Sequence, residues 1–216
     1  MSEIMTGLSF VIAGIHSNVF TNFTIVNALL FVYLAGALCF LIILFLTDAK
    51  YQLIPDKVVY TGIFFVLFSL IIIYAVDLYV YRQELLSDSF GKYLYQAGFW
   101  NQALVGYMKN IIFLLGSSFV ISLFFFALIW ITKGRGMGGG DVKLGFLIGL
   151  FNGLPLNFVA IFLGFLLGAV YSVVLVVLRK KSLRDTIAFG PFLILGSVIA
   201  FLWGQELVNW YIGVIR

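Results

Sequence analysis

Stretches without a charged residue constrain this chain more than any other feature. They cover residues 24–47, 58–76, 110–132 and 144–178. An α-helix rises 1.5 Å per residue, so crossing about 30 Å of hydrocarbon takes roughly 20 residues. Of the 216 residues, 63% are hydrophobic and 10% are charged, whereas soluble domains contain about 25% charged residues. The chain is therefore predicted to be an integral membrane protein.

The last of these stretches would be about 52 Å long as one straight helix, which is too long for a single crossing. Asn152, Gly153 and Pro155 interrupt it, and such residues break helices. The segments expected after the first three spans are 142–151, 155–178 and 190–210. The predicted fold is an all-α polytopic membrane helix bundle, with about six transmembrane helices and a short, broken fourth helix.

The N-terminal part of the chain differs from the rest. Residues 4–15 are apolar but too short to span a membrane. We expect residues 1–23 to form an interfacial segment and residues 24–216 to form one membrane-embedded domain. The connection at 79–107 is rich in Tyr, Phe and Trp, which is typical of a loop at the membrane interface.

The distribution of Lys and Arg predicts the orientation in the membrane. If the loop at 48–57 faces the cytoplasm, nine of the 13 basic residues lie on that side, as the positive-inside rule requires. The nine are Lys50, Lys57, Lys133, Arg135, Lys143, Arg179, Lys180, Lys181 and Arg184, and the other four are Arg82, Lys92, Lys109 and Arg216. Both termini would then be outside. The net charge of +4 is explained by the topology and by contact of the run 179–181 with anionic lipid. The sequence therefore gives no support for nucleic-acid binding.

Three of the nine acidic residues, Asp48, Asp56 and Asp141, lie at the cytoplasmic ends of apolar segments. Placing an ionisable group at membrane depth costs free energy, so its presence there indicates a function. The glycine-rich run at 134–140 disfavours a helix, so we expect a loop that enters a wet cavity. Two carboxylates over such a cavity can hydrolyse a peptide, because one takes a proton from water while the other donates to the carbonyl oxygen. The helix N-terminus at Asp141 favours its anionic form.

Each of these residues also has a structural interpretation. Asp56 follows Pro55 and is most simply a helix N-cap, whereas Asp48 could be a boundary charge and Asp141 a cap. Lys143 could orient a carboxylate, bind a lipid phosphate or anchor the topology. The chain has one histidine and one cysteine, which argues against a zinc site and excludes an internal disulfide. We expect no metal and no cofactor.

Three motifs resemble those of the bacterial type IV prepilin peptidases, which belong to the GxGD membrane aspartic proteases. The first is Asp48 with six residues before Pro55-Asp56. The second is the run GMGGGDVKL at 136–144, which matches the family pattern GMGxGDxKL. The third is FGPFL at 189–193, followed by Gly196. The motifs stand in family order between the expected spans, and the resemblance covers roughly residues 25 to 205.

The resemblance implies that Asp48 and Asp141 are the catalytic pair of an aspartic endopeptidase in the cytoplasmic (inner) membrane, with the active site facing the cytoplasm. Its substrates would be prepilin or pseudopilin precursors of type IV pili or type II secretion, cut after a glycine that ends a short basic leader. Membrane lipids would be its other partners. The residues implied to shape the substrate site are Gly138, Gly139, Gly140, Lys143, Asp56, Phe189, Gly190 and Pro191.

Larger bacterial members also carry an N-terminal cysteine-tetrad region and methylate the new N-terminus. Only about 23 residues precede the first span here, with one cysteine in the chain, so we expect a short form that acts as a peptidase alone. One alternative is an enzyme similar to the archaeal preflagellin peptidases. An alternative of a different class is a small proton-coupled transporter that binds its ion at the same aspartates.

Overall fold

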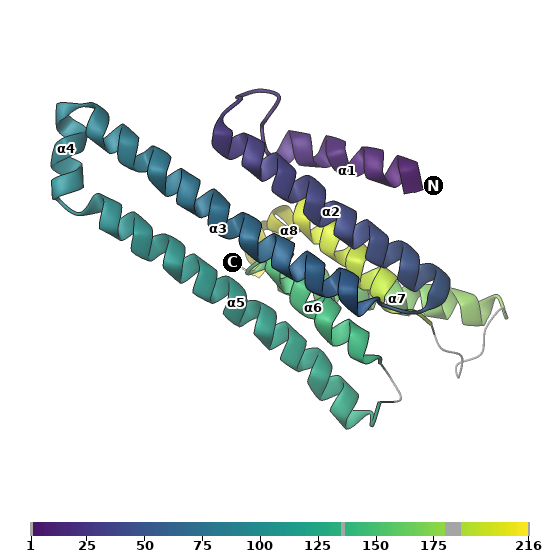
Figure 1. Ribbon diagram of the computed structural model, residues 1–216. Helices are drawn as coiled ribbons and strands as arrows, with labels where there is room; N and C mark the ends of the chain where they lie inside the picture. The colour runs from purple at the N-terminus through teal and green to yellow at the C-terminus, as the bar shows by residue number, and fades with distance from the viewer. Residues whose placement is uncertain (1, 135–136, 180–186, 216) are drawn as a thin grey trace. The chain divides into compact units, whose positions relative to one another are not determined.

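The computed structural model describes residues 2–134, 137–179 and 187–215. These residues form helices joined by short connections, and no strand occurs among them (Figure 1). In chain order the helices are α1 (Ser2–His16), α2 (Ile25–Tyr51), α3 (Asp56–Ser87), α4 (Ser89–Gln96), α5 (Phe99–Ile131), α6 (Gly139–Asn152), α7 (Leu156–Val177) and α8 (Gly190–Ile215).

Five of these helices, α2, α3, α5, α7 and α8, are long and apolar enough to cross a membrane. With 14 residues, α6 is about 21 Å long and shorter than the hydrocarbon layer. It stands fourth among the six predicted segments, and it is short as predicted. The all-α polytopic membrane bundle is thus confirmed. The apolar stretch near the N-terminus forms the 15-residue helix α1, whereas its interfacial position stays a prediction.

The prediction of a loop at 79–107 is wrong. Helix α3 continues to Ser87, α4 follows directly, and α5 begins at Phe99. Asp88 caps α4, since its Oδ1 accepts a hydrogen bond of 2.6 Å from the Gly91 N–H. The charged residues in this region end the apolar stretch without ending the helices, because a helix outside the hydrocarbon still satisfies its own backbone hydrogen bonds.

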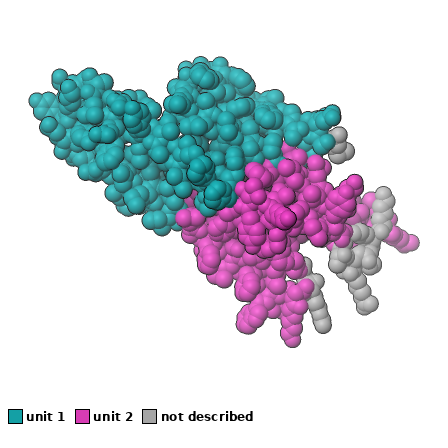
Figure 2. Space-filling model, viewed as in Figure 1, with its two compact units in different colours: residues 1–39, 64–113 teal, residues 40–63, 114–216 magenta. Residues whose placement is uncertain are grey.

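The described chain divides into two compact units, coloured separately in Figure 2. Unit 1 comprises residues 1–39 and 64–113, and unit 2 comprises residues 40–63 and 114–216. Within unit 1, the hydroxyl of Tyr107 donates a hydrogen bond to Asp77, and the ring of Tyr74 lies 5.0 Å from that of Tyr107. The predicted division of the chain after residue 23 stays a prediction.

Unit 2 contains α6 packed closely against its neighbours. A Cβ added to Gly149 of α6 would lie 2.7 Å from Ser118 Cα of α5, and α6 also contacts α7 and α8. The pair α7 and α8 is equally close, since a Cβ on Gly164 would lie 3.0 Å from Leu193 Cα and one on Gly196 would collide with the Ala160 carbonyl. Small residues let membrane helices approach in this way. This packing holds the helix that carries Asp141 in place.

Candidate active site

Asp48 lies in the last turn of α2, and only 5% of its surface is exposed. The chain leaves the helix at Gln52, whose φ of 51° is in the left-handed region, and it reaches the first residue of α3, Asp56, after three more residues. Gly190, the first residue of α8, lies directly against the Asp48 carboxylate, because a Cβ added there would collide with Asp48 Oδ2. The ends of α2 and α8 therefore meet at this carboxylate.

Asp141 lies in the first turn of α6 and is 7% exposed. Its Oδ2 accepts a hydrogen bond of 3.2 Å from the Gly138 N–H, and its own N–H donates to the Gly138 carbonyl at 3.1 Å. Burial raises the pKa of Asp141 from its ordinary 3.8 to about 6; the Gly138 N–H opposes this rise and the charge of Asp48 adds to it. Desolvation thus outweighs the preference for the anion that the helix N-terminus predicts.

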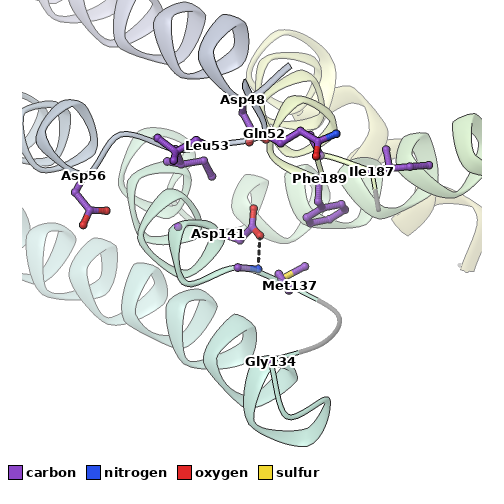
Figure 3. Close-up of a pocket in the computed structure, with 13 residues that line it drawn as sticks. Asp48, Gln52, Leu53, Asp56, Gly134, Met137, Asp141, Ile187 and Phe189 are labelled. Atoms are coloured by element: carbon purple, nitrogen blue, oxygen red, sulfur yellow. Dashed lines mark hydrogen bonds between the residues drawn. The ribbon is translucent and has the colours of Figure 1, made fainter. Parts of the chain in front are cut away.

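Both carboxylates line one cavity of about 450 Å³ (Figure 3). Its other lining residues are Gln52, Leu53, Ile54, Asp56, Gly134, Met137, Gly138, Gly140, Ile187, Ala188 and Phe189. The lining therefore comes from the α2–α3 connection, the start of α6 and the segment before α8. Two buried carboxylates whose charges interact beside a space large enough for water and a peptide can share one proton.

Lys143 and Asp56 form an ion pair of 2.8 Å between Nζ and Oδ2 at the rim of the site. Their side chains are 31% and 60% exposed, and the Lys143 ammonium also lies 5.1 Å from the centre of the Tyr60 ring. Asp56 is the first residue of α3, and its carboxylate faces α6 rather than capping its own helix. The structure thus pairs Lys143 with a carboxylate, that of Asp56, whereas its predicted roles in the site stay predictions.

The remaining predicted site residues lie in two groups around the aspartates. Gly140 is next to Ile54, whereas a Cβ on Gly139 would meet nothing within 4 Å. Phe189 lines the cavity, and its ring lies 4.9 Å from Phe165 and 6.3 Å from Phe125. Pro191 is buried in the first turn of α8 and is not part of the lining.

Sequence reasoning missed several lining residues, chiefly Leu53, Ile54, Met137 and Ile187. Leu53 and Ile54 carry a signal that could have found them, since they are adjacent apolar residues between two motif aspartates. Predictions that concern Arg135, Gly136, Lys180, Lys181, Arg184 and Arg216 lie outside the described residues.

Residues 35–173 match the model of the Type IV leader peptidase family. The match covers more than half of the chain and includes both aspartates, and the chain belongs to this family. It is accordingly a membrane peptidase, and the transporter alternative loses its basis.

Relatives of this chain carry the name prepilin leader peptidase/N-methyltransferase. The chain is 28% identical to the one from Bacillus subtilis (strain 168), over 98% of its own length and 68% of that protein. It is 35% identical to one from Aeromonas salmonicida (strain A449) and to one from Pseudomonas aeruginosa, over 39% and 38% of the chain. It covers only 29% and 28% of those two proteins. No solved structure matches the chain.

Proposed function

We propose that this chain removes the short basic leader from prepilin and pseudopilin precursors, cutting after a glycine, with Asp48 and Asp141 as the catalytic pair. The observation that carries the proposal is the placement of two buried carboxylates, from separate helices, on one cavity. Both belong to the stretch that matches the Type IV leader peptidase family. The names of the relatives supply the substrate class.

The proposed chemistry needs a water molecule between the two carboxyl groups. The ionised carboxylate takes a proton from the water as its oxygen attacks the scissile carbonyl carbon, and the protonated carboxyl donates its proton to the carbonyl oxygen. As the C–N bond of the tetrahedral intermediate breaks, a hydroxyl proton returns to the carboxylate that acted as the acid, and the leaving amine receives the proton taken from the water. The raised pKa of Asp141 supports this scheme, because it keeps one proton on the pair at higher pH than an exposed aspartate could.

We also propose that the cavity opens toward the cytoplasm from the inner membrane. A lysine stands within two residues of each of the three aspartates: Lys50 after Asp48, Lys57 after Asp56, and Lys143 after Asp141. Basic residues beside span ends favour the cytoplasmic side. The leader would then meet the cavity in the compartment where the precursor is made.

The test is cleavage of a prepilin with a basic leader ending in glycine, by detergent-solubilised enzyme. Wild type should convert the precursor to the mature size, and Asp48→Asn and Asp141→Asn should each reduce the rate by at least about a thousandfold, since either change removes half of the proton-sharing pair. Asp77→Asn, a carboxylate of unit 1, is the matched control and should cleave normally. Near-normal turnover by either dyad variant would refute the assignment.

Mass spectrometry of the mature product addresses the prediction of a peptidase without methyltransferase activity. With S-adenosylmethionine present, the new N-terminus should have the unmodified mass. A product heavier by one methyl group would contradict that prediction and leave the peptidase proposal intact.

A further inference from the structure

Ile54 packs against the backbone next to one of the two catalytic aspartates. It lies in the short connection between α2 and α3 and lines the cavity. A Cβ added to Gly140, the residue before Asp141, would lie 3.0 Å from Ile54 Cβ and 3.3 Å from its Cδ1. These distances are shorter than ordinary van der Waals contacts between carbon atoms, so Ile54 already occupies the space that a side chain at position 140 would need.

The same side chain also lies near the other aspartate. A Cβ added to Gly190 would lie 3.4 Å from Ile54 Cδ1, and it would also collide with Asp48 Oδ2. Both distances are measured from the same added Cβ at Gly190, so Ile54 Cδ1 lies close to the Asp48 carboxylate. Ile54 therefore lies between the starts of α6 and α8, next to the residue that precedes Asp141 and near the Asp48 carboxylate.

Ile54 is also poorly able to move aside. Its side chain branches at Cβ and has few allowed rotamers, and the following Pro55 restricts the backbone of the residue before it. Two residues after Ile54, Asp56 forms its ion pair with Lys143 of α6. The wall that Ile54 makes is held in place by the local chain as well as by packing.

We propose that Ile54 determines the size of the substrate residue whose carbonyl is attacked, and that it admits glycine and excludes larger residues. The inference rests on the proposed function, because it concerns the same cavity. In this proposal the Cα of that residue lies beside Ile54, since Ile54 lines the same cavity as the two carboxylates. A side chain on that Cα would collide with Ile54, whereas glycine has no Cβ and fits.

The experiment compares two prepilins that differ only in the last leader residue, glycine or alanine, mixed in one reaction. The ratio of their kcat/KM values does not depend on how much of the enzyme is folded, because both substrates meet the same enzyme. Wild type should prefer glycine by about ten- to two-hundredfold, the usual range for one carbon in a tight pocket. Ile54→Ala should lower this preference at least tenfold, and Ile54→Val should lower it by less.

Ile43→Ala is the matched control, because Ile43 lies in α2 within unit 2, is 45% exposed and is not part of the cavity lining. It should keep the wild-type ratio. If Ile54→Ala cleaves neither substrate, the glycine-to-alanine preference of Ile54→Val tests the inference instead, and it should be lower than that of wild type. A wild-type ratio in an Ile54 variant that still cleaves the glycine leader would overturn the inference and leave the proposed function standing. Failure of wild type to cleave any leader would overturn both.

Discussion

Replacing Asp141 by asparagine should make the protein more stable while making it inactive. The folded protein ionises Asp141 at a pKa of about 6, compared with the ordinary value of 3.8, chiefly because the side chain is buried. The unfolded chain therefore releases this proton first as the pH rises. The free energy of unfolding is unaffected by this group below pH 3.8, falls as the pH rises toward 6, and stays lowered above it. Asparagine does not ionise, so the free energy of unfolding of the variant does not fall in this way as the pH rises.

The magnitude follows from the same two values. The difference between 3.8 and about 6, at about 1.36 kcal/mol for each pKa unit, gives an upper limit of about 3 kcal/mol. In a protein of this size that corresponds to a rise in melting temperature of about 6–12 °C at most. The Gly138 N–H keeps an acceptor in the variant, because the asparagine side chain still carries an oxygen.

Thermal unfolding in detergent at pH 7.5 and pH 4 measures the effect. Asp141→Asn should melt above wild type at pH 7.5, and the gap should shrink markedly at pH 4. Asp56→Asn is the matched control; its carboxylate is 60% exposed, so its removal should not stabilise the protein. Equal melting temperatures for Asp141→Asn and wild type at pH 7.5 would refute the argument that burial of the charge destabilises the fold.

Three further changes test the packing around the site. Gly190→Ala should slow cleavage by about a hundredfold, as expected when a reacting group is displaced by about 1 Å, because the new methyl group collides with the adjacent Asp48 carboxylate; normal turnover would show that the helix start can move. Gly140→Val should abolish cleavage, because its side chain has no room beside Ile54 and would crowd the approach of the substrate to Asp141; the same assay measures this. A double-mutant cycle of Lys143→Met and Asp56→Asn should give a coupling below about 1 kcal/mol in unfolding, since exposed ion pairs contribute little; a value of 3 kcal/mol would contradict this.

Hydropathy located the membrane helices but misplaced some of their ends. The charge-free stretch at 110–132 predicts only the uncharged part of α5, which begins at Phe99. Charges mark the edge of the hydrocarbon and do not interrupt the backbone hydrogen bonds of a helix. The short helix expected at 142–151 runs from Gly139 to Asn152. Its start is earlier because the Gly138 backbone pairs with Asp141 in the first turn.

The part of the site that could be predicted from the sequence is the part that the motifs contain. The order of the motifs predicted that Asp48 and Asp141 serve one site, and both line the same cavity. The contact of Ile54 with the glycines was not predictable, because it depends on how the loop lies across two helix starts. The pairing of Lys143 with Asp56 could not be foreseen for the same reason: the sequence offers several carboxylates near that lysine, and only the packing selects one.

Helix α6 has a consequence for the membranes in which this protein can work. Most of its residues from Leu144 to Phe151 are buried against other helices of unit 2, whereas many apolar side chains of α5 are exposed. Thinning or thickening of the bilayer acts on helices that lipid contacts, which respond by tilting. The depth of Asp141 is set by helix packing instead, and a change in acyl-chain length should leave its position among its neighbours unaltered.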